Sequence, residues 1–179
     1  MVKVSKSKNG FDHSRFNVFC KDNDLKFPKS YVDHLQIYND GDLELNCVEF
    51  QDNATNIRYF YGTSTEESYD LIAVYQVYKD RIPKNCVAIA EDDFGNQICI
   101  SLNTDTYGKI YFWDHEKMDA DENEKNKLQV NDMILIANSF EEFCSKIQSL
   151  DTDDIPHYSS IRITWNRFVS WLRTKWDKL

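Results

Sequence analysis

The first predicted element is a short helix that begins after Pro28. Proline suits the first helical turn, where its missing N–H group costs nothing. Tyr31, Leu35 and Tyr38 then recur at positions i, i+4 and i+7, which is the spacing of one helical face. Residues 39–41 (Asn-Asp-Gly) can adopt the left-handed backbone that ends a helix. We therefore expect one amphipathic helix over about residues 28–39.

Strand-like patterns come in two groups. Residues 43–50 and 57–61 alternate between apolar and polar positions, and they predict an antiparallel hairpin joined by the polar segment 51–56. The second group predicts an antiparallel meander with short turns, and its strands are residues 86–90, 97–102 and 108–113. The continuous apolar run at 86–90 is typical of a strand that is buried on both faces.

Two further helices are indicated by capping boxes, in which a serine precedes a glutamate by three positions. The first box is Ser64 with Glu67, and the second is Ser139 with Glu142, after a short predicted strand at 133–137. Apolar side chains at helical spacing follow each box: Leu71, Ile72, Tyr75 and Tyr78 after the first, and Phe140, Phe143, Cys144, Ile147 and Leu150 at the second.

This order of elements predicts an α+β fold, because strands follow one another without an intervening helix for each. We expect a mainly antiparallel, twisted sheet of five or six strands, flanked by helices. An extra C-terminal helix is predicted from about residue 159, with Trp165 and Trp176 on its apolar stripe. The length of 179 residues suits one domain, which we place at residues 27–150. Residues 1–26 are then an N-terminal arm, and residues 151–179 a helical extension packed on the domain.

Composition and charge narrow the classes of function. The chain is 41 % hydrophobic and 14 % aromatic, which is enough for a sizeable core. Its 21 basic and 30 acidic side chains leave a net charge of −9, which disfavours nucleic acid as a partner. The acidity is concentrated in residues 91–154, which hold five basic and sixteen acidic side chains, a net charge of −11. A basic protein is therefore the favoured partner.

No motif for catalysis or for cofactor binding is recognisable. The chain has no glycine-rich phosphate loop, no close pair of cysteines and no pair of histidines at metal-ligand spacing. Its five cysteines lie in apolar contexts and are expected to be reduced thiols. The sequence has no apolar stretch of 18 residues and no secretory signal. We therefore predict a cytoplasmic protein with no metal, no cofactor and no membrane contact, present as a monomer or weak dimer.

Acidic side chains follow the first and the third strand of the predicted meander. The first and third strands of a meander run parallel, so the 91–96 turn and residues 114–116 should lie at the same edge of the sheet. As protein-binding residues we select Glu91, Asp92, Asp93, Asn96, Asp114 and Glu116, with Tyr111 or Trp113 as an aromatic anchor. The same acidic residues are also compatible with an ordinary solvated surface.

Five ordered patches of the chain resemble the SUKH superfamily, which includes bacterial immunity proteins and fungal cell-wall synthesis regulators. The patches are residues 27–41, with Phe27-Pro28 and Asn39-Asp40-Gly41; 82–83, with Ile-Pro; 89–99, with the Glu-Asp-Asp-Phe-Gly-Asn turn; 108–116; and 137–143. The chain departs from the family pattern at Ala88, Phe94 and Asn96.

The resemblance implies an α+β fold, no enzymatic activity and a protein-binding role. Our main hypothesis is a cytoplasmic immunity protein that neutralises a basic toxin domain, such as a nuclease, through the acidic surface. Reversing Asp92 and Asp93 to lysine is then predicted to weaken toxin binding at a nearly unchanged melting temperature. The alternatives are a regulatory or scaffold module, and a hydrolase whose site is assembled from distant residues.

Overall fold

The fold is built on one sheet of six antiparallel strands. A computed structural model describes residues 10–40, 43, 46–51, 53–118 and 129–148. The strands follow the chain in the order β1-β2-β3-β4-β5-β6, and every neighbouring pair is antiparallel. Their bounds are β1 Cys47–Phe50, β2 Asn53–Phe60, β3 Cys86–Asp92, β4 Gln97–Ser101, β5 Ile110–Trp113 and β6 Ile134–Ala137. The predicted hairpin and meander are confirmed as parts of this sheet.

The hairpin between β1 and β2 is tighter than its polar sequence suggested. We expected residues 51–56 to form the connection, but Phe50 already pairs with Asn53, so most of that segment belongs to β2. Gln51 takes a positive φ of 52° at the turn. The polar residues are accommodated in a strand because backbone pairing with β1 satisfies their N–H and C=O groups.

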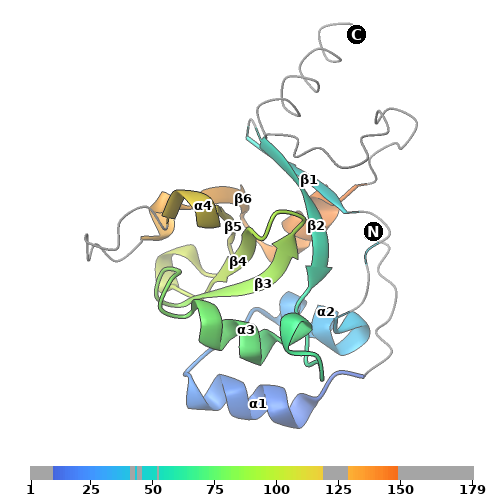
Figure 1. Cartoon of the computed structure of the whole chain (residues 1–179). Helices are drawn as coiled ribbons and strands as arrows, with labels where there is room; N and C mark the ends of the chain where they lie inside the picture. Colours follow the sequence, from blue (N-terminus) through green and yellow to red (C-terminus); the bar gives the residue numbers. More distant parts are fainter. Residues whose placement is uncertain (1–9, 41–42, 44–45, 52, 119–128, 149–179) are drawn as a thin grey trace, which may run out of the picture.

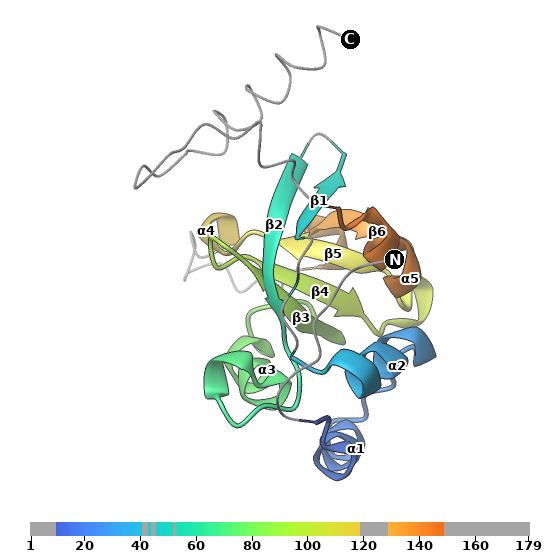
Figure 2. The ribbon, with the colours of Figure 1, turned by 90° about the vertical axis from the view of Figure 1, so that its right-hand side faces the viewer.

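The sheet is strongly curved. In Figure 2, β1 and β2 run steeply across β3, β4 and β5. The ring of Phe50 lies 5.2 Å from that of Phe112 on β5. Two backbone hydrogen bonds, of 3.1 and 2.9 Å, link Cys47 at the edge of β1 to Gln148, just after the last described helix. The curvature therefore encloses apolar side chains, and this last pairing closes part of the gap between the sheet edges.

Five α-helices are described: α1 His13–Asp22, α2 Lys29–Tyr38, α3 Leu71–Tyr78, α4 His115–Met118 and α5 Phe140–Lys146. Helices α2 and α5 pack against one face of the sheet through aromatic rings. Phe60 of β2 lies 4.8 Å from the His34 ring and 6.2 Å from the rings of both Phe140 and Phe143, measured between ring centroids. This packing buries His34, and burial lowers its pKa to about 4.

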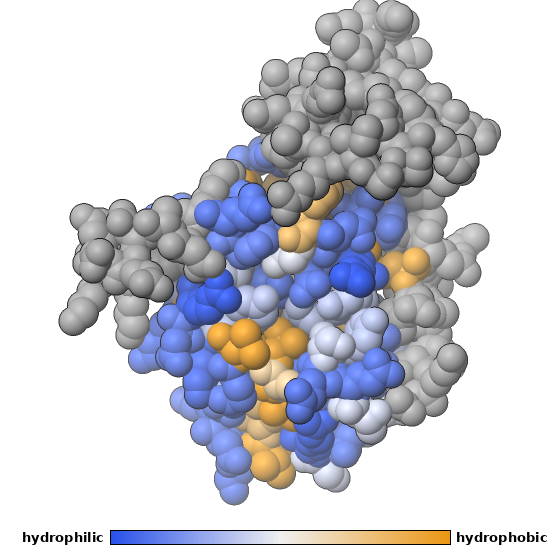
Figure 3. All heavy atoms as spheres, in the orientation of Figure 1, coloured by the Kyte–Doolittle hydropathy of each residue, from blue (hydrophilic) through white to orange (hydrophobic). Residues whose placement is uncertain are grey.

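Helices α3 and α1 form successive layers, since α3 lies next to the sheet and α1 lies beyond it (Figure 1). Phe19 of α1 packs edge-on against Tyr75 of α3, with 5.1 Å between ring centroids. Helix α1 falls within residues 1–26, the segment that the sequence suggested as an arm. It nevertheless buries Phe16 and Phe19 in the common core. In Figure 3, apolar side chains form a narrow strip over α3 and α1, on a face that is otherwise mostly hydrophilic.

The cap of α3 differs from the predicted capping box. Asp70, not Ser64, caps the helix, because its carboxylate accepts hydrogen bonds from the backbone N–H groups of Ile72 and Ala73 at 3.1 and 2.8 Å. The same carboxylate forms a two-point ion pair with Arg15 of α1. The Ser64 hydroxyl instead accepts from the backbone N–H of Glu66. A buried, ion-paired carboxylate is the stronger acceptor, so the helix begins at Leu71.

The structure also tests what was expected for the C-terminal part of the chain. Ser139 caps α5 as expected, accepting from the N–H of Glu142 at 3.1 Å. Residues 115–118 form the one-turn helix α4. Residues 119–128 and the predicted C-terminal helix lie outside the described residues. Among the described residues, no helix combines the length and apolarity needed to cross a bilayer. The α+β class with an antiparallel sheet is confirmed.

Candidate functional site

The turn between β3 and β4 is organised by the buried carboxylate of Asp92. Its two oxygens accept four hydrogen bonds, and its side chain is 0 % exposed. The donors are the Thr55 hydroxyl (2.8 Å), the backbone N–H groups of Phe94 and Asn96 (both 2.8 Å), and the Asn96 amide (2.9 Å). A carboxylate has about four acceptor positions, so this one is fully used within the protein. Asp92 was predicted to contact a partner; the prediction is wrong for this residue, because no surface is left to make a contact.

The end of β5 joins this turn, as the meander predicted. The Asn96 side-chain oxygen lies 2.9 Å from Nδ1 of His115 and 3.3 Å from its backbone nitrogen. Gly95 has a φ of +86°, and a Cβ at this position would lie 3.5 Å from the His115 ring. Residues 92–96 and 114–116 therefore form one continuous end of the sheet, which we call the acidic rim.

The first turn of α4 is fixed within the acidic rim by Asp114. Its carboxylate accepts a hydrogen bond of 3.1 Å from the backbone N–H of Glu116. This is the usual way in which an aspartate starts a helical turn, and it explains why residues 115–118 form one. Glu116 is left exposed and Asp114 is partly exposed.

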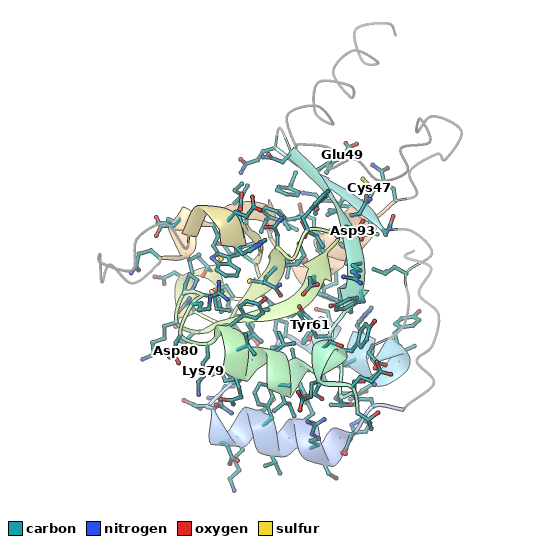
Figure 4. All side chains as sticks on the ribbon, viewed as in Figure 1. Cys47, Glu49, Tyr61, Lys79, Asp80 and Asp93 are labelled. Atoms are coloured by element: carbon teal, nitrogen blue, oxygen red, sulfur yellow. The ribbon has the colours of Figure 1, made fainter. Side chains whose placement is uncertain are left out.

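Glu91, the residue before the rim, faces a row of neutral polar side chains. Its carboxylate accepts hydrogen bonds from the Tyr59 and Tyr61 hydroxyls, both at 3.0 Å, and it lies 3.4 Å from the Gln97 amide. Arg58 approaches it at 3.9 Å. Burial and the neighbouring charge of Glu91 raise the pKa of both tyrosines. Figure 4 labels Tyr61 in this row, between β3 and α3. With 19 % of its side chain exposed, Glu91 contributes its charge to the rim more than a contact surface.

The two predicted aromatic anchors are not available on the surface. Trp113 is 1 % exposed and packs edge-on against Tyr78 of α3, with the guanidinium of Arg81 5.3 Å from its ring centre. Tyr111 is also buried in the core, where burial raises its pKa. Both predictions are wrong for a partner contact. All four residues of β5 are buried, and on one face helix α3 covers Trp113.

An exposed aromatic residue that sequence reasoning did not select is Phe94, which is 57 % exposed at the tip of the rim. Asp93, the residue before it, is exposed, and Figure 4 shows Asp93 at the end of β3. Glu116 is also exposed, and it follows His115, which contacts Asn96. The sequence could have indicated the exposure of Phe94, because it lies in the tight turn between Asp92 and Gly95, where side chains commonly point outward. The rim thus combines exposed acids with one aromatic side chain.

Comparison with known proteins places this geometry in a family. Residues 12–146 match the SMI1 / KNR4 family (SUKH-1). The chain belongs to this family. It is also 38 % identical over 92 residues to the SPbeta prophage-derived uncharacterized protein YokK of Bacillus subtilis (strain 168). That match covers 51 % of this chain and 41 % of the relative, so the chain matches less than half of the relative's length.

The family match confirms the resemblance that the five patches indicated. It covers the whole acidic rim and all six strands. It also begins at residue 12, and therefore includes helix α1, which the patches did not reach. The contacts of Phe16 and Phe19 with the core give a physical reason for this extent, because α1 buries apolar surface that α3 would otherwise expose.

Metal binding and thiol reactivity are both limited in the described residues of this SUKH-1 domain. In that part of the chain, no three His, Cys, Asp or Glu side chains are grouped so that they could hold a metal ion. Burial raises the pKa of the Cys20 and Cys86 thiols to about 11 and that of Cys144 to about 12. These thiols stay protonated near neutral pH and are poor nucleophiles. A shallow hollow of about 360 Å³ lies away from the rim and is lined by residues such as Lys84, Asn103 and Val130.

Proposed function

We propose that this SUKH-1 protein is an immunity protein that binds and neutralises a cognate toxin domain through the acidic rim. The observation that carries the proposal is the convergence of exposed Asp93 and Glu116, with partly exposed Asp114, at one end of the sheet. Membership of the SUKH-1 family and the similarity to a prophage-derived protein support an immunity-type role. We further propose that the protein acts by binding and not by catalysis, in the cytoplasm, as one copy per toxin.

Electrostatics gives the mechanism of recognition. Nuclease-type toxins present lysine and arginine side chains to phosphate groups, so a fixed array of carboxylates can occupy the same surface. The rim belongs to the segment with a net charge of −11, and its backbone is held in place by Asp92 and by the contact between Asn96 and His115. Complementary charge mainly accelerates association, and it does so most at low ionic strength.

The test uses the protein encoded by the reading frame next to this gene. Its C-terminal domain is expressed in a host cell with and without the SUKH-1 protein, and binding is measured with the purified pair. We expect the SUKH-1 protein to restore growth. A double reversal of Asp93 and Glu116 to lysine should slow association by about tenfold or more at low salt, with an unchanged urea midpoint. The matched control reverses Glu66 and Asp105, which are exposed and lie outside the rim.

The outcomes separate the alternatives. Equal effects of the two double reversals would show that the rim is not the binding surface. Binding without restored growth would favour a regulatory or scaffold module. A turnover in the purified protein that is lost on replacing His115 would favour the hydrolase reading and overturn the proposal.

A further inference from the structure

Phe94 is presented on a rigid support. The carboxylate of Asp92 holds the backbone N–H of Phe94 at 2.8 Å, and the same oxygen holds that of Asn96. The turn closes further with a hydrogen bond of 3.3 Å from the N–H of Gly95 to the carbonyl of Asp92. The ring is therefore exposed while its backbone is fixed. A backbone that is fixed before binding loses little further conformational entropy when a partner covers the side chain it carries.

The surroundings of Phe94 indicate what kind of surface could cover it. Asp93 precedes it, and Glu116 belongs to the same end of the sheet, because it follows His115, which contacts Asn96. Lys109 is the only lysine or arginine between positions 91 and 116, and it lies before β5, at the opposite end of that strand. An apolar ring framed by carboxylates fits an apolar pocket whose edge carries lysine and arginine. Such an arrangement places the apolar contact at the centre of an interface and the charges at its periphery.

A second copy of this chain is a poor fit for the same position. Two-fold symmetric pairing through the rim would bring Asp93 and Glu116 of one copy close to the same residues of the other. Like charges in that geometry oppose association, and each chain already carries a net charge of −9.

We propose that Phe94 is the hydrophobic anchor of the acidic rim, and that it inserts into an apolar pocket of a protein partner whose edge is lined by lysine and arginine side chains. This inference rests on the proposed function and adds the chemistry of the contact. The acids govern how fast the partner arrives, and the buried ring governs how slowly it leaves, since anchor residues act mainly on dissociation.

The experiment compares Phe94→Ala with Tyr107→Ala. Tyr107 is the matched control, because it is an aromatic residue of similar exposure, 48 %, in the link at the other end of β4. The probe is the purified, catalytically inactivated C-terminal domain encoded by the neighbouring reading frame, and dissociation is followed by surface plasmon resonance. Phe94→Ala should raise Kd about thirtyfold or more, mostly through faster dissociation. Phe94→Leu should raise Kd less than Phe94→Ala does, and Tyr107→Ala should change Kd less than twofold.

Each result decides between the two proposals. Binding by the wild type with nearly equal Kd for Phe94→Ala would overturn the anchor and leave the proposed function standing. No binding by the wild type would overturn the proposed function for this partner and the anchor with it. Dimerisation of the free protein that Phe94→Ala abolishes, measured by sedimentation, would assign the ring to self-association instead. Urea midpoints of both alanine variants should match the wild type, because neither ring is buried.

Discussion

Replacing Asp92 by alanine should destabilise the fold strongly, although the residue lies in an acidic turn at the surface end of the sheet. The side chain is fully buried and its oxygens accept hydrogen bonds from Thr55, Phe94 and Asn96. A hydrogen bond to a charged group contributes roughly 1.5–3 kcal/mol net. The contribution of the bond from the buried Thr55 hydroxyl is lost in full. Water can partly replace the three bonds at the turn, so the loss of each of these costs roughly 0.5–1 kcal/mol.

These contributions sum to an expected loss of about 3–6 kcal/mol in the free energy of unfolding, from a typical total of about 5–15 kcal/mol. The control is Asp93→Ala, since Asp93 is exposed and accepts only a long hydrogen bond of 3.3 Å from Asn56 among the bonds described. Its effect should stay within about 0.5 kcal/mol. Urea unfolding followed by far-UV circular dichroism measures both variants, with the slope of the transition checked for constancy.

A free energy of unfolding for Asp92→Ala within about 0.5 kcal/mol of that for Asp93→Ala would contradict a structural role of the Asp92 carboxylate. The burial of Asp92 also corrects the expectation that reversing Asp92 and Asp93 together would leave the melting temperature nearly unchanged. A lysine at position 92 would place an ammonium group against three N–H donors and one hydroxyl in a site with no exposed surface. Only Asp93 of this pair is suitable for testing binding, which is why the functional variants use Asp93 with Glu116.

Two further predictions concern the packing of helix α2. His34 has a pKa of about 4 in the folded protein, against 6.5 in the unfolded chain, so the unfolded state binds the proton more readily. The free energy of unfolding should therefore be highest above pH 6.5 and should fall by about 3 kcal/mol on acidification to pH 4. The difference in unfolding free energy between wild type and His34→Phe should change by that amount over this range, and a constant difference would contradict the assignment. Gly62→Ala should destabilise by about 2 kcal/mol or more, because its Cβ would lie 2.4 Å from the side-chain oxygen of Asn39. Gly10→Ala, with no atom within 4 Å of the added Cβ, is the control for thermal melting.

Much of the fold could be predicted because its signals are local. Alternation along residues 97–102 reflects side chains that point to opposite faces of a strand, and short polar turns leave antiparallel pairing as the simple solution. The cap of α5 by Ser139 is likewise a contact within one helical turn. The cap of α3 could not be predicted, because Asp70 is favoured by its ion pair with Arg15, 55 residues earlier in the chain. The position of helix α1 also depends on a distant surface, that of α3.

That acidic residues 91–93 and 114–116 share one end of an antiparallel sheet follows from the sequence alone, since chain direction in a meander requires it. Which of these side chains face water depends on how the rest of the chain packs around them. Asp92 and Asp93 are adjacent and chemically identical, yet Thr55 of β2 covers one and leaves the other exposed. Trp113 was buried by α3 in the same way, and Phe94 was left outside. Burial depends on which distant segment packs over a residue, and that information is carried by contacts across the fold and not by the local pattern.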